Sequence, residues 1–323
     1  MRLLVVGGTA FVGRHAVEAA VADGHDVTVF HRGRTNSSLL AGEVTHRLGD
    51  RDGGDAGSDY TSLASDDAWD AVIDVSAYVP RHVHELFAEV GDRCRHYVHV
   101  SSISAYAIAG MTLREDSPLA ADLDDPDVED VDAETYGPLK AMGERAARQS
   151  FGATRTAVVR PTYVAGPHDH TERFTYWARR MVRGGDVAVI DPESPLQIID
   201  ARDLGAFLVR LAVDGTAGAF DAVGPYGPIS DLLARIAPEG VDYRLVSVSS
   251  DVLAEHGVRL PLLAPSDGPV ALQTRPGTGA RAAGLATRPV EATAMAIREL
   301  DVARCEPDLP VGPSPAEEAA LFS

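Results

Sequence analysis

Apolar and polar residues alternate in blocks along the first part of the chain, and the blocks have two different periods. Apolar runs of strand length occupy residues 2–8, 25–32, 69–77, 96–102 and 154–161. Apolar residues at helical spacing occupy 11–24, 80–93 and 136–149. Strands that alternate with helices predict a parallel sheet covered by helices on both faces, which is the doubly wound α/β class.

The pattern becomes less regular after Gly166, and Pro and Gly become frequent after Gly224. Residues 201–215 and 218–224 nevertheless carry a helix pattern and a strand pattern like those of the first part. We therefore expect a larger α/β domain, which the chain leaves and rejoins, and a smaller C-terminal lobe. The larger domain is predicted to contain residues 1–164 and about 195–224, and the smaller lobe about 165–194 and 225–323.

A glycine-rich turn joins the first predicted strand to the first predicted helix. In VVGGTAFVGRHA, Gly7, Ala10 and Gly13 have the spacing of a dinucleotide fingerprint, with alanine at the middle position. Gly7 permits the tight turn, Gly13 lets helix and strand pack closely, and the amides of the helix N-terminus can bind a pyrophosphate. The turn predicts that the larger domain is a Rossmann-type dinucleotide-binding domain, although a turn that binds nothing could have the same local sequence.

The residues after the second predicted strand bear on the choice of dinucleotide. An acidic residue there binds a ribose 2′-hydroxyl, whereas arginine accommodates a 2′-phosphate. The chain has His31 where an acid is expected, followed by Arg32 and Arg34, and Arg14 could join them. These arginines favour NADP(H) over NAD(H), unless they are ordinary surface side chains of a loop. Asp50, in LGDRD, is a candidate partner of the adenine amino group.

Composition and charge exclude several classes of protein. The formal net charge of −19 argues against a nucleic-acid partner, which needs a basic surface. The apolar start is too soon broken by glycines for a signal peptide, and no run has the length of a membrane span. Cys94 and Cys305 lie far apart without metal-site spacing, so we expect free thiols in a reducing compartment. A soluble cytoplasmic protein is predicted.

Lys140 is the single lysine among the 29 Lys and Arg residues. It follows Tyr136 by four residues, so the two side chains share one face of the predicted helix. Pro138 falls in the first turn, where its missing N–H is tolerated. A free tyrosine ionises at about pH 10, but a nearby ammonium and the helix N-terminus favour the phenolate. Tyr136 is therefore a candidate acid/base, and Ser102, at the end of a predicted strand, a candidate to hold the substrate oxygen.

Seven segments in a fixed order resemble one enzyme family: GGTAFVG, LGDRD, VIDVSA, VSSISAY, TYGPLK, RPTYVAGP and IDARDLGAF. The chain is similar to the extended short-chain dehydrogenases/reductases, also called the NAD-dependent epimerase/dehydratase family. The resemblance implies a Ser102–Tyr136–Lys140 triad, a nicotinamide near the RPTYVAGP segment and, by analogy, a homodimer that pairs through the Tyr–Lys helix. Motifs and resemblance together predict these cofactor-binding residues: Gly7, Thr9, Ala10, Phe11, Val12, Gly13, Arg32, Arg34, Asp50, Arg51, Ser76, Ala77, Tyr136, Lys140, Pro161, Tyr163 and Val164.

Three features depart from the nucleotide-sugar epimerases of that family. The segment 114–134 is long and acidic, and we interpret it as a lid beside the site or as a solvated loop. Leu196 or Gln197 stands where those epimerases tend to carry an arginine that clamps a diphosphate. Arg32 and Arg34 favour NADP(H), whereas sugar epimerases retain NAD. Each feature favours a less charged substrate.

Other clusters leave their interpretation open or point away from function. The histidines at 82–84 and 168–170 lack a third ligand, so no metal site is predicted. The GGTAF segment also resembles a side group that includes chloroplast stem-loop RNA-binding proteins, but the negative charge and the intact Tyr–Lys pair argue against that role. Four arginines of the helix predicted at 171–185 could contact phosphate or form a solvated face: Arg173, Arg179, Arg180 and Arg183.

The sequence thus predicts an NAD(P)(H)-dependent oxidoreductase that transfers hydride at a carbinol or carbonyl carbon of a small or sugar-like substrate, bound with the help of the smaller lobe. Reduction, oxidation and epimerisation remain open. One alternative is a nucleotide-sugar epimerase or dehydratase with retained NAD, and another is a non-catalytic dinucleotide-sensing or binding protein. No nucleic-acid or membrane partner is expected.

Overall fold

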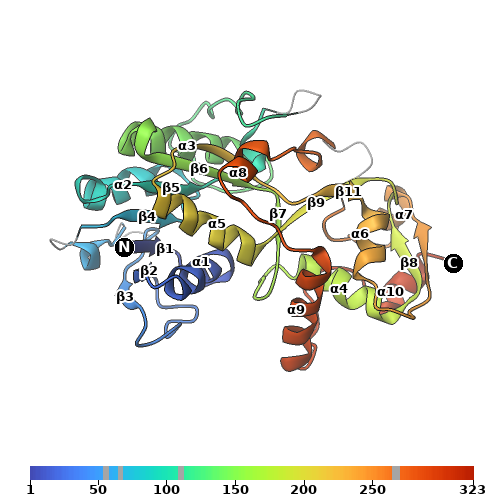
Figure 1. Ribbon diagram of the computed structural model, residues 1–323. Helices are drawn as coiled ribbons and strands as arrows, with labels where there is room; N and C mark the ends of the chain where they lie inside the picture. Colours follow the sequence, from blue (N-terminus) through green and yellow to red (C-terminus); the bar gives the residue numbers. More distant parts are fainter. Residues whose placement is uncertain (54–57, 65–67, 108–112, 264–269) are drawn as a thin grey trace. The chain divides into compact units, whose positions relative to one another are not determined.

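The computed structural model describes residues 1–53, 58–64, 68–107, 113–263 and 270–323. The chain forms two compact units, whose segments can be followed by colour in Figure 1. Unit 1 contains Met1–Thr162, Ala201–Val223 and Pro276–Ala286. Unit 2 contains Tyr163–Asp200, Gly224–Arg275 and Thr287–Ser323.

Unit 1 is built on a seven-stranded sheet in which all neighbouring strands are parallel, in the order β10-β6-β5-β4-β1-β2-β3. The predicted doubly wound parallel sheet is therefore confirmed. The strand order reverses between β1 and β4, and in such sheets the carboxyl ends at the reversal flank the ligand crevice. The strands are β1 (Arg2–Val6), β2 (Asp26–His31), β3 (Thr45–Leu48), β4 (Ala71–Asp74), β5 (Tyr97–Val100), β6 (Thr156–Pro161) and β10 (Gly218–Ala222).

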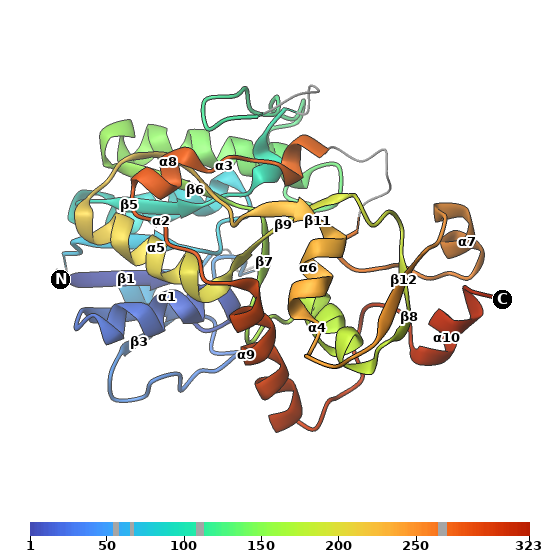
Figure 2. The same cartoon turned by 45° about the vertical axis from the view of Figure 1, so that its right-hand side comes forward.

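Helices cover both faces of this sheet. The helices α1 and α5 pack together on one face, and α2 and α3 pack together on the other, as both views show (Figures 1 and 2). Gly205 permits the first contact, because a Cβ there would lie 2.6 Å from the backbone of His15. The helices of unit 1 are α1 (Phe11–Ala22), α2 (Pro80–Val90), α3 (Tyr136–Phe151), α5 (Ala201–Asp214) and α8 (Thr278–Ala282), with short 3-10 helices η2 (Thr61–Leu63), η3 (Gly91–Arg93), η4 (Ile103–Ala105) and η5 (Ala153–Arg155).

The borders of the units differ from the sequence-based division at two places. Residues 276–286, expected in the smaller lobe, belong to unit 1, where α8 packs against β10. Residues 195–200, expected in the larger domain, form a strand of unit 2. In both places the neighbours in space decide the border, and these neighbours are distant in sequence.

Unit 2 has two small sheets, ordered β11-β9-β7 and β12-β8, and a separate hydrophobic core. Trp177 of α4 is fully buried in that core, together with Leu233 and Ile297. The strands are β7 (Tyr163–Ala165), β8 (Gly185–Val189), β9 (Pro195–Asp200), β11 (Tyr226–Pro228) and β12 (Tyr243–Ser247). The helices are α4 (Arg173–Arg183), α6 (Ile229–Ile236), α7 (Ser250–Glu255), α9 (Val290–Ala303) and α10 (Pro315–Ala320), with the 3-10 helix η6 (Val270–Gln273).

Candidate active site

The glycine turn between β1 and α1 leaves no room for larger side chains. Gly7 has a φ of +85°, and a Cβ there would lie 2.8 Å from the Ser76 Oγ. A Cβ on Gly13 would lie 2.3 Å from the Gly7 carbonyl oxygen. Ala10, the N-cap of α1, supplies no side-chain acceptor for the amides of the first helical turn. Such a turn suits a pyrophosphate, because backbone donors can approach it closely.

The remaining predicted residues of this turn lie beside the two glycines. Thr9 is buried, and its carbonyl oxygen accepts a 3.0 Å hydrogen bond from the side-chain Nδ2 of Asn36. Phe11 and Val12 are the first two residues of α1, and Phe11 has a φ of 37°. The bond from Asn36 ties the loop after β2 to the turn.

Two histidines organise the loop after β2. The Nδ1 of buried His31 accepts a 3.0 Å bond from the Gly33 amide, so its Nε2 donates to the His46 Nδ1 at 2.9 Å. His46 Nε2 in turn bonds the Leu39 carbonyl oxygen at 3.1 Å. Burial, followed by the neighbouring His46, lowers the pKa of His31. His31 is therefore a neutral structural group rather than a substitute for the usual acid.

Arg32 and Arg34, which are predicted to favour NADP(H) over NAD(H), lie on this loop. Arg32 is 49% exposed and lies 3.8 Å from Asp52, and Arg34 is 70% exposed and lies 3.3 Å from Asp50. Arg14, in contrast, donates to Glu18 one turn further along α1, at 2.6 Å. Exposed pairs of this kind are weak, so neither carboxylate holds its arginine strongly.

Arg51 differs from these two arginines because it is buried. Its guanidinium donates to both carboxylate oxygens of Asp74, at 2.8 and 2.9 Å, and to the Ser76 Oγ at 2.9 Å. Burial by itself would raise the pKa of Asp74, but the Arg51 charge lowers it to about 2. The Asp74 carboxylate also accepts a 3.0 Å bond from the Ser76 amide. In this structure Arg51 fixes the segment after β4, a role that its position in LGDRD did not indicate.

Lys140 reaches from α3 to the carboxyl ends of β4 and β5. Its Nζ donates to the Ala77 carbonyl oxygen at 2.9 Å and to the Val100 carbonyl oxygen at 3.2 Å. Only 4% of the residue is exposed, and this burial lowers its pKa to about 8, against the opposing effect of Asp74. The Nζ lies 5.9 Å from the centre of the Tyr136 ring. The two side chains therefore share one face of the helix, as the i, i+4 spacing predicted.

Ser102 and Tyr136 lie on segments that meet at Gly137. A Cβ at Gly137 would lie 2.5 Å from the Ser104 carbonyl oxygen, so glycine lets the start of α3 approach the turn after β5. The Ser102 Oγ accepts a 3.1 Å bond from the Ser104 amide. The neighbouring Ser101 donates to Glu144 at 2.6 Å, and its hydroxyl is thereby committed to the core, which leaves Ser102 as the candidate of the pair.

The other predicted cofactor residues lie at the strand ends. Pro161 is the last residue of β6 in unit 1, whereas Tyr163 and Val164 belong to β7 in unit 2. The structure thus brings two groups of predicted residues together within unit 1. The first is Gly7, Gly13, Ser76 and Arg51, and the second is Ala77, Tyr136 and Lys140.

Tyr78 is a residue of this site that sequence reasoning missed. Its ring centre lies 4.6 Å from the Lys140 Nζ, closer than the Tyr136 ring, and the residue is 48% exposed. The available signal was an aromatic residue directly after VIDVSA, at the carboxyl end of a predicted strand.

The acidic segment before α3 is held to the helices of unit 1. Glu129 pairs with Arg81 of α2 through bonds of 2.6 and 2.8 Å, and Asp122 pairs with Arg145 of α3. A pocket of about 510 Å³ lies between the segment and these two helices. At these two points the segment is anchored, which differs from a freely solvated loop.

The four arginines of α4 divide into two kinds. Arg179 pairs with Asp301 at 2.8 Å, and Arg180 and Arg183 both pair with Glu318 of α10. Arg180 is buried, so neither a solvated face nor phosphate contact describes it. Arg173 donates to the Thr171 hydroxyl at 3.0 Å and lies over the Tyr163 ring. Ion pairs within unit 2 therefore account for three of the four.

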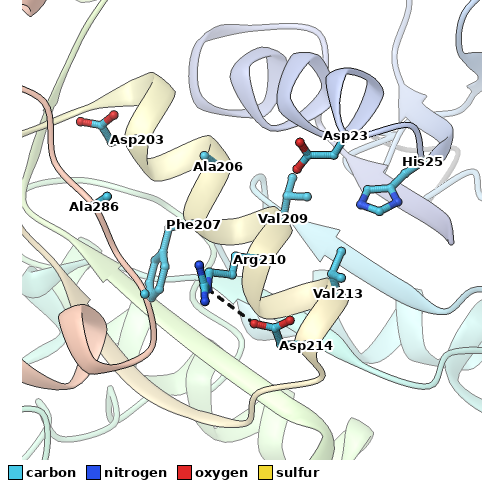
Figure 3. Close-up of a pocket in the computed structure, with 11 residues that line it drawn as sticks. Asp23, His25, Asp203, Ala206, Phe207, Val209, Arg210, Val213, Asp214 and Ala286 are labelled. Atoms are coloured by element: carbon cyan, nitrogen blue, oxygen red, sulfur yellow. Dashed lines mark ion pairs between the residues drawn. The ribbon is translucent and has the colours of Figure 1, made fainter.

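A further pocket of unit 1, of about 530 Å³, lies along α5 (Figure 3). Asp23, His25 and Phe207 line it, and Arg210 pairs with Asp214 at 3.5 Å inside it. None of the predicted catalytic or cofactor residues lines this pocket. It is therefore distinct from the candidate active site.

The described residues show neither a metal-binding cluster nor a membrane-spanning helix. Among the described residues, no three His, Cys, Asp or Glu side chains gather in a way that could hold a metal ion. Within the same residues, no helix is both long and apolar enough to cross a membrane.

The parallel sheet with its strand-order reversal and glycine turn defines unit 1 as a Rossmann-type fold. Residues 3–220 match the NAD dependent epimerase/dehydratase family, and the chain belongs to that family. The earlier expectation of an NAD(P)-dependent enzyme agrees with this membership.

Individual proteins are similar to this chain at low sequence identity. The chloroplast stem-loop binding protein of 41 kDa b from Arabidopsis thaliana is 27% identical over 212 residues, which are 61% of this chain and 50% of that protein. The chain thus spans about half the length of this curated relative.

Solved structures share the fold. The UDP-N-acetylglucosamine 4-epimerase from Methanobrevibacter ruminantium, in complex with UDP-N-acetylmuramic acid, is 16% identical with a TM-score of 0.67, covering 94% of this chain and 98% of that one. The Bordetella bronchiseptica enzyme WbmH, in complex with NAD+, is 17% identical with a TM-score of 0.63, covering 93% and 98%. At these identities the likeness concerns the fold.

Proposed function

We propose that the protein is an NAD(P)(H)-dependent oxidoreductase of the extended short-chain dehydrogenase/reductase type, acting at a carbinol or carbonyl carbon of a small or sugar-like substrate. The observation that carries the proposal is the buried Lys140 ammonium, which shares a helix face with Tyr136 next to the loop that follows β4. Burying a cation is costly, and a role in proton transfer gives a reason to keep it.

In this proposal Tyr136 moves the proton and Ser102 orients the substrate oxygen. During oxidation the substrate hydroxyl gives its proton to the Tyr136 phenolate while the adjacent carbon loses hydride, and reduction is the reverse. The positive charge of Lys140 stabilises the phenolate. When bound, the nicotinamide ring would supply or accept that hydride. Gly7 and Gly13 allow the close packing of the turn, because neighbouring protein atoms occupy the space that a Cβ would need. The amides at the start of α1 would bind the pyrophosphate.

For the cofactor we propose NADP(H), with Arg32 and Arg34 as the residues that recognise the 2′-phosphate. Their exposure and their weak pairing with Asp52 and Asp50 support this. Calorimetric titration should show tighter binding of NADP+ than of NAD+. Arg34→Gln should reduce that preference at least tenfold, since charge-assisted bonds to phosphate contribute about 1.5–3 kcal/mol. Tighter binding of NAD+ by the unaltered protein would overturn the assignment.

The acid/base role is tested with Tyr136→Phe on a substrate found by screening sugars and small carbonyl compounds. The variant keeps the ring but loses the exchangeable proton, so turnover should fall at least a hundredfold. The loss of one hydroxyl should change dinucleotide affinity much less than that. Tyr226→Phe, on an exposed tyrosine of unit 2, is the matched control. Unchanged turnover in Tyr136→Phe would remove the proposed role.

A second candidate is a nucleotide-sugar epimerase or dehydratase with retained NAD. Family membership favours it. The similar structures of MoeE5 in complex with UDP-glucose and NAD, and of the UDP-N-acetylglucosamine 4-epimerase in complex with UDP-N-acetylmuramic acid, also favour it. Denaturing such an enzyme would release a stoichiometric amount of NAD. A preparation free of dinucleotide that binds NADP+ reversibly would favour the first candidate, and binding without any turnover would favour a sensing protein.

A further inference from the structure

Tyr78 belongs to the immediate surroundings of Lys140. It lies in the short segment between β4 and α2, directly after Ala77, whose carbonyl oxygen accepts from the Lys140 Nζ at 2.9 Å. The Nζ is 4.6 Å from the Tyr78 ring centre and 5.9 Å from that of Tyr136. An ammonium within about 6 Å of an aromatic face is attracted by the ring quadrupole. Both tyrosines meet this distance, and Tyr78 meets it more closely.

The ammonium has few other partners that favour its charge. Two of its three N–H donors go to the carbonyl oxygens of Ala77 and Val100. The charged groups that act on it are Asp74 of β4 and Glu144 of α3, which favour the cation, and Arg51, which opposes it. Besides the two tyrosines, His99 of β5 is a titratable neighbour. Burial and the Lys140 charge lower the pKa of His99 to about 4, so it is neutral near neutral pH.

Lys140 and Tyr78 differ in their exposure to solvent. Lys140 is 4% exposed, whereas Tyr78 is 48% exposed. The Tyr78 ring thus contacts the buried ammonium while part of the residue remains in contact with solvent. An aliphatic side chain that covers an ammonium removes its water and gives no attraction in return. An aromatic face also excludes water, but it attracts the cation and so offsets part of the cost of desolvation.

We propose that Tyr78 is a positioning residue, whose ring holds the Lys140 ammonium in place beside Tyr136. The inference rests on the proposed role of Lys140 in proton transfer, and it adds to the triad an aromatic partner that acts through the lysine rather than on the substrate.

The single lysine makes a direct test available. A chain grown with labelled lysine gives one side-chain NMR signal at the ζ nitrogen, and its titration against pH reports the pKa of Lys140 alone. We expect Tyr78→Leu to lower this pKa by about half a unit to one unit, since it removes the ring but keeps an apolar cover. Tyr78→Phe retains the aromatic face and should titrate like the unaltered protein. Tyr226→Leu, on an exposed tyrosine of unit 2, should leave the titration unchanged.

Three results would overturn the inference. An unchanged pKa in Tyr78→Leu means that the ring does not act on the ammonium, and a raised pKa means that Tyr78 only excludes water. A pKa in Tyr78→Phe as low as in Tyr78→Leu assigns the effect to the hydroxyl instead. If Tyr78→Leu fails to give a dispersed amide spectrum, Tyr78→Met replaces it. The titration needs neither cofactor nor substrate, so its failure is distinguishable from failure of the proposed function, which the dinucleotide and Tyr136→Phe experiments decide.

Discussion

Lys140 carries its charge in surroundings that oppose it. The residue is 4% exposed, and its pKa is lowered from 10.5 to about 8 by burial. Its two carbonyl acceptors and the Asp74 charge offset only part of the loss of water. Arginine could not replace it here, since a planar guanidinium is bulkier and does not titrate. The structure thus explains why a chain that otherwise uses arginine keeps one lysine at this position.

The lowered pKa predicts how stability depends on pH. Below about pH 8 Lys140 is protonated in both the folded and the unfolded chain. Between about 8 and 10.5 the unfolded chain still holds a proton that the folded chain has released, so the free energy of unfolding rises with pH. The shift corresponds to about 3 kcal/mol over that range, and Lys140→Met lacks this gain.

Denaturant unfolding of the unaltered protein and Lys140→Met at several pH values checks this prediction. The difference between the two free energies of unfolding should change in favour of the unaltered protein as the pH rises. Parallel curves would mean that Lys140 titrates in the folded protein as it does in a free peptide.

Among the elements, the turn from β1 into α1 depends most on close backbone approach. A Cβ at Gly13 would lie 2.3 Å from the Gly7 carbonyl oxygen and 2.9 Å from the Gly8 Cα. Both are backbone atoms, so no side-chain rotation can relieve the overlap. α1 would have to move away from β1, and the amides at its N-terminus would move with it.

Gly13→Ala should therefore weaken dinucleotide binding at least tenfold and lower the free energy of unfolding by about 1–3 kcal/mol. Titration calorimetry measures the first effect and denaturant unfolding the second. Gly227→Ala is a matched control, because no atom apart from Gly227 itself and its two chain neighbours lies within 4 Å of the added Cβ. Dinucleotide affinity equal to that of the unaltered protein would show that the turn does not hold the pyrophosphate.

At the scale of the whole molecule, the acidic segment bears on self-association. The family resemblance implies a dimer through the Tyr–Lys helix, which here is α3. In unit 1 the segment is anchored to α2 by the Arg81–Glu129 pair and to α3 by the Arg145–Asp122 pair. The segment therefore covers part of both helices. Because this cover would hinder pairing through α3, we predict a monomer, in contrast to the homodimer that the resemblance implies.

Sedimentation velocity at increasing concentration tests this expectation. The unaltered protein should sediment as a monomer, and a variant with both Arg81→Gln and Arg145→Gln should show a concentration-dependent dimer, because the segment is released. Arg244→Gln, which breaks an exposed pair with Asp186 in unit 2, should remain monomeric. A dimer of the unaltered protein would contradict the idea that the segment blocks this face.

Local patterns predicted most of the larger domain, and they failed where an element is short and exposed. β3 was not predicted, because Thr45–Leu48 is four residues long, contains polar residues and forms the edge of the sheet. Its pairing with β2 gives it strand structure that its own sequence does not indicate. Residues 276–286 were assigned to the other unit for a similar reason, since α8 packs on β10 from far along the chain.

The sequence by itself determined the parallel sheet, the glycine turn and the shared helix face of Tyr136 and Lys140, because each depends on residues close together in the chain. Only the tertiary structure decided which polar residues are buried and what they meet. The sequence placed Arg51 among the cofactor-binding residues, but only the fold shows that its guanidinium pairs with Asp74. Likewise, only the fold shows that the Lys140 ammonium lies over the Tyr78 ring. The type of a residue shows which ionisable group it carries. The neighbours of that group come from segments that are distant in sequence and meet only when the chain folds.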